Sequence, residues 1–354
     1  MHILHVVGAR PNFMKVAPVM RAFAAISQVE QTLVHTGQHY DANMSDVFFE
    51  QLDIPRPDVF LGVGSASHAA QTAEIMIRFE QTVLQRKPDW VMVYGDVNST
   101  AAASLVCSKL NPKVAHVEAG LRSFDRRMPE EINRLVTDQL ADWLLTPSKD
   151  ANENLIREGI RDEKIRCVGN VMIDTLCHLL PKARTPENAK TDDPYALVTL
   201  HRPSNVDDKK TLEKIVSTLG EISQECQLFF PLHPRTRDRM KEFGISLGDF
   251  SAIEWLEPIG YLECLALQKD AQFVITDSGG LQEETTYLQV PCLTLRENTE
   301  RPVTLDQGTN ILIGKDMALL KTEVRNILNG KPKQGKIPEL WDGKTGQRIT
   351  EIFI

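Results

Sequence analysis

The sequence has little that would suit a membrane, a nucleic acid or a metal ion. No apolar run approaches the roughly 20 residues that a membrane-spanning helix needs. The formal net charge is -8, so a nucleic-acid groove and an anionic membrane surface are not expected. The histidines that follow strands of the second half, His201 and His233, do not have the H-x-x-x-H spacing of a metal site, and we expect no metal. We therefore expect the functional basic residues to form a small local group that binds a small anion.

Cysteine is scarce and scattered. The six cysteines show no C-x-x-C spacing and sit among apolar neighbours, which is typical of small core residues in a reducing compartment. The N-terminal MHILHVVGARPNF lacks both a charged leader and an apolar segment long enough for a signal peptide. These features predict a cytoplasmic protein.

The G-x-G-x-x-G fingerprint of dinucleotide-binding enzymes is missing as well. The nearest match, GVGSAS at 62–67, comes before a helix but follows no predicted strand. This argues against a nicotinamide-dependent dehydrogenase.

Apolar strand-like runs alternate with helical stretches along most of the chain. With 354 residues, of which 42% are hydrophobic and 25% charged, the composition is that of a globular protein of about two domains. Strand runs this apolar, separated by helices, indicate parallel sheets buried on both faces. The expected strands are 3–7, 32–36, 90–94, 113–117, 143–146 and 164–168, then 195–200, 226–232, 252–256, 272–277, 290–295 and 310–313.

The segment PKARTPENAKTDDP at 181–194 is poor in apolar residues and is the expected linker. It divides the chain into domains 1–180 and 195–340, followed by a terminal helix at 341–354. Two doubly wound domains would turn the carboxyl ends of their strands, and so the ligand site, toward a shared cleft.

Two loops at predicted strand ends suit an anion. Arg10 and Lys15 follow the first strand, where they fit an anion contact and a surface charge equally well. In TDSGGLQEE, Ser278, Gly279 and Gly280 open a helix whose free N–H groups and dipole favour phosphate. Ser278 could instead be a simple N-cap.

Three carboxylates follow neighbouring strands of the first domain. Asp96 lies in YGDVNST, Glu118 in HVEAGL and Glu130 in PEEINR, and His201 follows the first strand of the second domain. Each has a plain structural alternative, such as an N-cap or a favourable place in a helix dipole. Their convergence on strand ends favours acid–base chemistry.

The motifs GARPNFMK, YGDVNST, HVEAGLRS, PEEINR, GNVMID, LHRPSN, TDSGGLQEE and TERP occur in this order over nearly the whole chain. Together they closely resemble the non-hydrolysing UDP-N-acetylglucosamine 2-epimerases. The resemblance implies a GT-B fold of two Rossmann-like domains, with the terminal helix packed back on the first. It also implies a homodimer, a UDP-sugar substrate and no cofactor.

The resemblance also assigns roles residue by residue. It implies catalytic roles for Asp96, Glu118, Glu130 and His201. It implies UDP-sugar contacts for Arg10, Lys15, Ser278 with Gly279 and Gly280, Glu284 and Arg301. We expect Arg122, also assigned to the substrate site, and Arg134 to hold Glu118 and Glu130 and tune their pKa values, and Glu131 to be structural.

The sugar stays open. The TGQHYDANMSD segment at 36–46 differs from that of relatives with an allosteric substrate site, although Gln38 and His39 are present. Similar segments occur in relatives that epimerise a 2,3-diacetamido-glucuronate sugar. Pro11 argues against the hydrolysing relatives. A GT-B glycosyltransferase and a non-catalytic sugar-nucleotide sensor are the alternatives from other classes.

Overall fold

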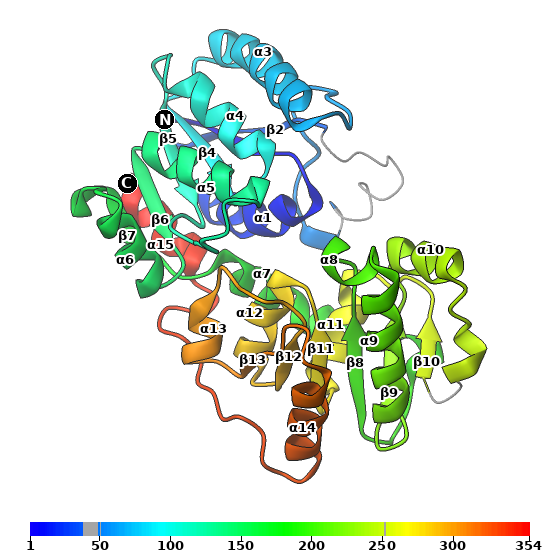
Figure 1. The fold of residues 1–354 in the computed structure, drawn as a ribbon. Coiled ribbons are helices and arrows are strands. Elements are labelled where there is room, and N and C mark those ends of the chain that lie inside the picture. The colour runs from blue at the N-terminus through cyan, green and yellow to red at the C-terminus, as the bar shows by residue number, and fades with distance from the viewer. Residues whose placement is uncertain (38–48, 50, 251–252) are drawn as a thin grey trace. The chain divides into compact units, whose positions relative to one another are not determined.

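The computed structural model describes residues 1–37, 49, 51–250 and 253–354, and its chain forms two α/β units (Figure 1). Unit 1 comprises Met1–His178 and Glu339–Ile354, and unit 2 comprises Leu179–Pro338. Each unit is wound around its own parallel sheet, which confirms the predicted class of two Rossmann-like domains. No helix among the described residues is long and apolar enough to cross a membrane.

Unit 1 contains a seven-stranded sheet of order β3-β2-β1-β4-β5-β6-β7. Neighbouring strands pair in parallel throughout. The apolar runs of these strands are buried because helices cover both faces of the sheet. The strands are β1 (His2–Val7), β2 (Glu30–His35), β3 (Val59–Phe60), β4 (Trp90–Tyr94), β5 (Lys113–Val117), β6 (Trp143–Thr146) and β7 (Ile165–Cys167).

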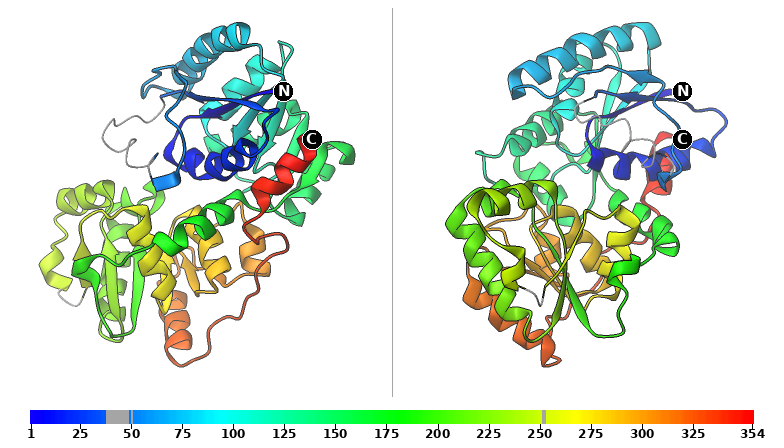
Figure 2. Two further views of the ribbon diagram at one scale, coloured as in Figure 1. Left: turned by 180° about the vertical axis from the view of Figure 1, so that it is seen from behind. Right: turned by 90° about the vertical axis from the view of Figure 1, so that its right-hand side faces the viewer.

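The helices of unit 1 fall into two layers. Right-handed crossovers place α1 on the face opposite α3, α4 and α5, because the chain runs toward opposite edges of the sheet on either side of β1. Figure 2 shows α1 beside α15, the last helix. The unit 1 helices are α1 (Arg10–Ala24), α3 (His68–Arg86), α4 (Asn98–Cys107), α5 (Pro129–Leu140), α6 (Lys149–Arg157), α7 (Val171–Leu179) and α15 (Thr345–Phe353).

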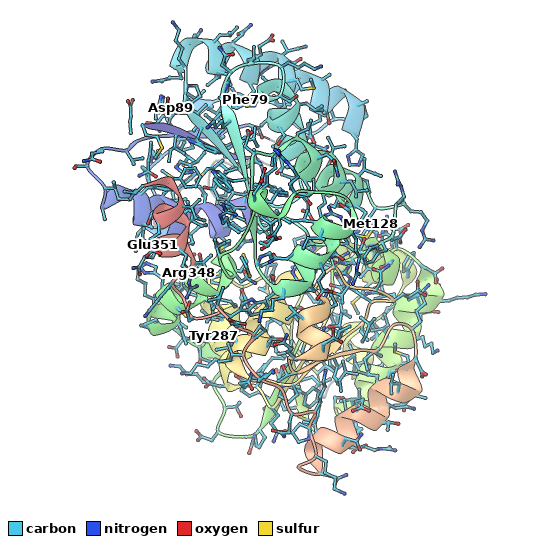
Figure 3. The ribbon with its side chains drawn as sticks, turned by 90° about the vertical axis from the view of Figure 1, so that its left-hand side faces the viewer. Phe79, Asp89, Met128, Tyr287, Arg348 and Glu351 are labelled. Atoms are coloured by element: carbon cyan, nitrogen blue, oxygen red, sulfur yellow. The ribbon has the colours of Figure 1, made fainter. Side chains whose placement is uncertain are left out.

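The chain after Pro338 is an integral part of unit 1. Trp341 is buried and its Nε1 donates to the carbonyl of Pro147 at 2.9 Å. A Cβ on Gly346 would lie 2.6 Å from the carbonyl oxygen of Pro18, so glycine lets α15 approach α1 closely. Arg348, labelled on α15 in Figure 3, donates to the carbonyl of Val168 at 3.0 Å.

Unit 2 contains a six-stranded parallel sheet of order β10-β9-β8-β11-β12-β13. On one face α9 packs against α14, and on the other α12 packs between α11 and α13. The strands are β8 (Tyr195–Thr199), β9 (Gln227–Pro231), β10 (Ile253–Leu256), β11 (Phe273–Thr276), β12 (Cys292–Thr294) and β13 (Asn310–Leu312). The helices are α8 (Pro203–Val206), α9 (Lys209–Ile222), α10 (Pro234–Phe243), α11 (Tyr261–Asp270), α12 (Gly279–Leu288), α13 (Pro302–Asp306) and α14 (Met317–Leu328).

Each sheet has one point at which the strand order reverses. In unit 1 it lies between β1 and β4, and in unit 2 between β8 and β11. The loops after such a pair of strands diverge, which leaves a crevice at their carboxyl ends where ligands of α/β proteins bind. Arg10 and Asp96 follow the first pair, and His201 and Asp277 follow the second.

Helix α1 begins at Arg10, where Asn12 Oδ1 accepts from the N–H groups of Gly8 and Ala9 at 3.0 Å and closes the first turn. Two local features differ from the sequence expectation. The short strand β3 was not predicted. The segment 181–194 carries two 3₁₀ turns, and its Ala189 is buried in the unit 2 core.

Candidate active site

Lys15 and Glu118 form a buried ion pair at the carboxyl edge of the unit 1 sheet. Lys15 Nζ lies 2.7 Å from Glu118 Oε1. Gly95, at a φ of +64°, leaves room for this ammonium group, because a Cβ there would lie 2.6 Å from Lys15 Nζ. Glu118 has a φ of +73°, a left-handed conformation that costs a non-glycine residue energy. A strained, buried and charged carboxylate at a strand end is a strong candidate for function.

Asp96 is held by a second cation. Arg134 NH1 donates to Asp96 Oδ2, and Arg134 NH2 lies 2.8 Å from Glu131 Oε2. Asp96 does not cap the following helix, whose N-cap is Val97. Its carboxylate therefore stays half-exposed at the end of β4, oriented from one side by a buried guanidinium.

Glu131 and Glu130 occupy very different surroundings. Glu131 is buried and accepts hydrogen bonds from Ser123 N at 3.0 Å and Phe124 N at 2.9 Å, so it fixes the loop after Glu118. Burial alone would raise the pKa of Glu131, yet these bonds and Arg134 hold it below its usual value. Glu130 is exposed in the first turn of α5, and no described residue forms a hydrogen bond or ion pair with it.

Arg122 and Arg134 form ion pairs with acids other than the expected Glu118 and Glu130. Arg122 is buried and its NH2 lies 2.7 Å from Asp138 Oδ2 and 2.6 Å from Glu158 Oε2. Both acids are remote from Arg122 in the sequence. They pair with its guanidinium group because a buried charge needs a close counter-charge. This geometry favours a structural role for Arg122 over the expected ligand contact.

His116 belongs to the same buried network, which the sequence did not reveal. Its Nδ1 lies 2.6 Å from Asp138 Oδ1 and its Nε2 lies 2.8 Å from the carbonyl oxygen of Gly95. Burial would raise the pKa of Asp138, yet His116 and Arg122 lower it. Both ring nitrogens of His116 therefore have a partner within the buried network.

In unit 2, the N-terminus of α12 follows β11 directly. Ser278 is the N-cap residue, but its hydroxyl does not accept a hydrogen bond from the helix. The simple N-cap alternative is therefore not what the structure shows. Gly279 packs closely, since a Cβ there would lie 2.8 Å from Arg301 NH1. The first N–H groups of α12 and a basic side chain thus lie together, as an anion site requires.

Arginines gather around this helix end. Arg301 Nε lies 2.9 Å from Glu283 Oε2, and Arg301 NH1 pairs with Glu300. Arg296 NH2 lies 2.7 Å from Glu300 Oε2. Burial, and next the like charge of Arg296, lower the pKa of Arg202. Like charges held this close favour an anionic ligand.

Glu284 is buried in the second turn of α12. Its Oε1 accepts from the hydroxyl of Tyr261 at 2.8 Å, and the amide of Gln268 lies 2.9 Å from its Oε2. Burial raises the pKa of Glu284 to about 7. A carboxyl group that titrates near neutrality can both donate to and accept from the hydroxyl groups of a sugar.

His201 is oriented by a buried carboxylate. Its Nδ1 lies 3.0 Å from Asp277 Oδ1, while the side chain is 42% exposed. Burial would raise the pKa of Asp277, but hydrogen bonds from His201, Arg202 and Asn205 keep it below its usual value. His201 was predicted as a site residue from the sequence, whereas Asp277 was not, although Asp277 directly precedes the Ser278 motif.

The structure thus brings Lys15 and Glu118 into contact within unit 1, and it places His201, Ser278, Gly279, Glu284 and Arg301 around β8, β11 and α12 within unit 2. Arg10 is exposed at the start of α1, and Gly280 lies in the first turn of α12. In the parts of the chain that the structure describes, no cluster of three or more His, Cys, Asp or Glu could hold a metal. Gln38 and His39 lie outside the described residues.

Comparison with known proteins shows which family this chain resembles. A family model described as UDP-N-acetylglucosamine 2-epimerase matches residues 21–354. A UDP-N-acetylglucosamine 2-epimerase of Methanocaldococcus jannaschii is 45% identical, covering 98% of this chain and 97% of the relative. A UDP-2,3-diacetamido-2,3-dideoxy-D-glucuronate 2-epimerase of Pseudomonas aeruginosa is 41% identical, and the match covers 100% of this chain and 99% of the relative.

The fold agrees equally well. The crystal structure of the Methanocaldococcus jannaschii UDP-GlcNAc 2-epimerase in complex with UDP-GlcNAc and UDP superposes with a TM-score of 0.91 at 44% identity. The match covers 100% of this chain and 99% of that chain. Sequence and fold agree, and the chain belongs to the UDP-N-acetylglucosamine 2-epimerase family.

Proposed function

We propose that this protein is a non-hydrolysing epimerase that interconverts UDP-N-acetylglucosamine and UDP-N-acetylmannosamine. The observation that carries the proposal is the buried Lys15–Glu118 pair, with Glu118 in a left-handed conformation at the end of β5. A purely structural ion pair would not need a strained backbone, whereas a carboxylate aimed at a reacting C–H bond does. The names of the relatives at 45% and 44% identity support the same substrate.

The proposed reaction is an elimination followed by an addition. One carboxylate takes the proton from C2 of the sugar while the C1–O bond breaks and its electron pair leaves with UDP, giving a glycal with a C1–C2 double bond. UDP then adds back at C1 as a second group delivers a proton to the opposite face of C2. Asp96, Glu118 and Glu130 are the proposed acid–base groups of unit 1.

The surroundings of these three acids suggest different roles in the reaction. Glu118 lies against the ammonium group of Lys15, and Asp96 lies against the guanidinium group of Arg134. Both carboxylates are thus held in place, and they are proposed as the groups that exchange the C2 proton. Glu130 is exposed, and no described residue forms a hydrogen bond or ion pair with it, so its side chain can turn toward the bound sugar.

Binding of UDP is assigned to unit 2, with Arg10 and Lys15 of unit 1 as further contacts. The N–H groups at Ser278, Gly279 and Gly280 and the guanidinium of Arg301 suit the diphosphate. Glu284 suits the ribose hydroxyl groups because it is buried beside α12 and titrates near neutrality. His201 is proposed to donate to the departing phosphate.

A second candidate substrate is the UDP-2,3-diacetamido uronic acid named for the Pseudomonas aeruginosa relative at 41% identity. The same elimination at C2 applies to it, because C2 of that sugar also carries an acetamido group. We further propose that the enzyme works as a homodimer in the cytoplasm, on the strength of the family motifs. Light scattering coupled to gel filtration tests the dimer.

The test is an incubation of purified protein in D2O with either UDP-sugar and no acceptor, followed by NMR. We expect a new UDP-sugar with deuterium at C2, since the incoming proton exchanges with solvent. Free N-acetylmannosamine would indicate a hydrolysing enzyme, and no reaction without an acceptor would favour a glycosyltransferase. Product with protium retained at C2 would contradict the elimination mechanism.

A further inference from the structure

We propose that Asp277 is a positioning residue that fixes the ring of His201, so that Nδ1 carries a hydrogen and Nε2 is the reactive nitrogen. The proposal rests on the proposed function for the role of His201, but its geometry stands independently. Asp277 follows β11 and His201 follows β8, and these two neighbouring strands flank the point where the order of the unit 2 sheet reverses.

The carboxylate of Asp277 is itself rigidly held. Its Oδ2 accepts from the backbone N of Arg202 at 2.9 Å and from Nδ2 of Asn205 at 3.1 Å, and the backbone N of His201 lies 3.1 Å from it. Thr199 and Thr276 bridge the two strands just before these residues, with their hydroxyl oxygens 2.7 Å apart. Asp277 therefore fixes both the loop that carries His201 and the ring of His201.

The hydrogen-bond chemistry then determines the tautomer. An ionised carboxylate has acceptors only, so the contact of 3.0 Å between Nδ1 and Oδ1 requires the hydrogen to be on Nδ1. Proton transfer and ligand contact are left to Nε2. The buried aspartate contacts Nδ1 of the ring, as a buried aspartate does in Ser-His-Asp enzymes.

A second Asp–His pair in the chain shows what a purely structural arrangement looks like. His116 also contacts a buried aspartate, Asp138, through Nδ1, but its Nε2 is engaged by the carbonyl of Gly95. His116 is fully buried, whereas the His201 ring is open to solvent and lies 5.5 Å from the ring of His233. The pair of His201 and Asp277 is therefore the one arranged for a ligand.

In the proposed reaction, this arrangement acts on the leaving group. As the C1–O bond breaks, its electron pair passes to the oxygen of UDP, and His201, carrying hydrogens on both ring nitrogens at this step, transfers the Nε2 proton to the phosphate. When UDP adds back, the phosphate returns that proton to Nε2. Asp277 does not take up a proton in either direction.

The first test is a double-mutant cycle with Asp277→Asn and His201→Gln. Asparagine keeps the size of the side chain but removes the charge, and we expect kcat to fall about 10- to 100-fold while the affinity for UDP stays close to wild type. The pH profile of kcat should also shift in Asp277→Asn. In the His201→Gln background the same change should cost little more, because its effect acts through His201. An equal loss in both backgrounds would overturn the proposal.

Asn205→Ala is the matched control. It removes a hydrogen bond to Asp277 without touching the ring of His201. We expect a lower melting temperature with a normal pH profile. A shifted profile in this variant would show that any loosening of the loop has the same effect, and would overturn the specific role of Asp277.

The second test needs no turnover and no substitution of Asp277. Nitrogen-15 NMR of histidine side chains in the wild-type protein, with His201→Gln for assignment, should show a hydrogen on Nδ1 of His201. A ring with its only hydrogen on Nε2 would overturn the proposal. If the wild-type protein epimerises neither UDP-sugar, the proposed function fails, whereas this result still decides the role of Asp277.

Discussion

Lys15 Nζ lies 2.7 Å from Glu118 Oε1, and both side chains are almost completely removed from solvent. Removing one member of a buried ion pair leaves the other without its counter-charge, which costs about 3–5 kcal/mol. We expect Lys15→Met to lose that much free energy of unfolding in urea titrations. Arg157→Met breaks the exposed pair with Glu153 and should cost no more than about 1 kcal/mol. Equal costs would show that the Lys15 pair is not effectively buried.

Glu118→Gln should separate chemistry from binding. Glutamine keeps the shape of the side chain but has no basicity, so turnover should fall by about 10²-fold or more. Calorimetry should find UDP affinity close to wild type, because the proposed phosphate contacts lie on the Ser278 loop. The exposed Glu153→Gln serves as the control with normal turnover. A Glu118→Gln enzyme of normal rate would remove Glu118 from the proton transfer.

Ser278→Ala should weaken UDP binding without destabilising the fold, because the Ser278 hydroxyl does not cap α12. The N-caps Asp208 and Asp316 are different, since each accepts hydrogen bonds from its own helix. Their alanine variants should lose about 1 kcal/mol of stability and keep UDP affinity. Calorimetric titration and thermal unfolding of the three variants measure both quantities. Unchanged affinity in Ser278→Ala would exclude its hydroxyl from the binding site.

Phe124→Gly should stabilise the protein by about 1 kcal/mol. Phe124 is 72% exposed and has a φ of +58°, so glycine relieves strain while little burial is lost. Ile77→Gly is the opposite case, because Ile77 is also apolar and exposed, at 57%, but lies inside α3. It should lose about 1 kcal/mol through helix propensity. Urea unfolding measures both, and a loss in Phe124→Gly would mean that its ring makes a contact worth more than the strain.

Glu284 should make stability depend on pH. Its pKa is raised from 4.5 to about 7 in the folded protein, so between these values the folded state holds a proton that the unfolded state has released. The contribution of Glu284 to the free energy of unfolding is therefore greatest below pH 4.5. It falls by about 3 kcal/mol at most as the pH rises toward 7.

Glu284→Gln stays neutral and keeps an acceptor for the Tyr261 hydroxyl. The difference in unfolding free energy between this variant and wild type should therefore grow from pH 5 to pH 8. A difference that does not change with pH would contradict the raised pKa.

Local patterns predicted the framework well. Strands such as 90–94, 113–117 and 143–146 were predicted at their observed bounds, because their apolar residues are buried on both faces. Strand β3 has only two residues, too few for a pattern. The residues at strand ends were located by the same means, since the carboxyl edge of a parallel sheet follows from the order of elements.

The partners of the charged residues were not predictable in this way. Arg122 pairs with Glu158, 36 positions away, although acidic residues lie much closer in the sequence. The backbone conformation of Glu118 and the hydrogen bonds of Asp277 are likewise consequences of packing between elements. Charge pairing depends on distance in space, which a single sequence does not contain.

The path of the chain affects the order in which the protein can be built. Unit 1 is interrupted after His178 and is completed only by Glu339–Ile354. During synthesis, the ribosome must finish all of unit 2 before α15 can cover α1, so the first unit to be started is the last to be finished. A stop codon that removed only the last few per cent of the chain would therefore damage the unit made first and leave the later one intact.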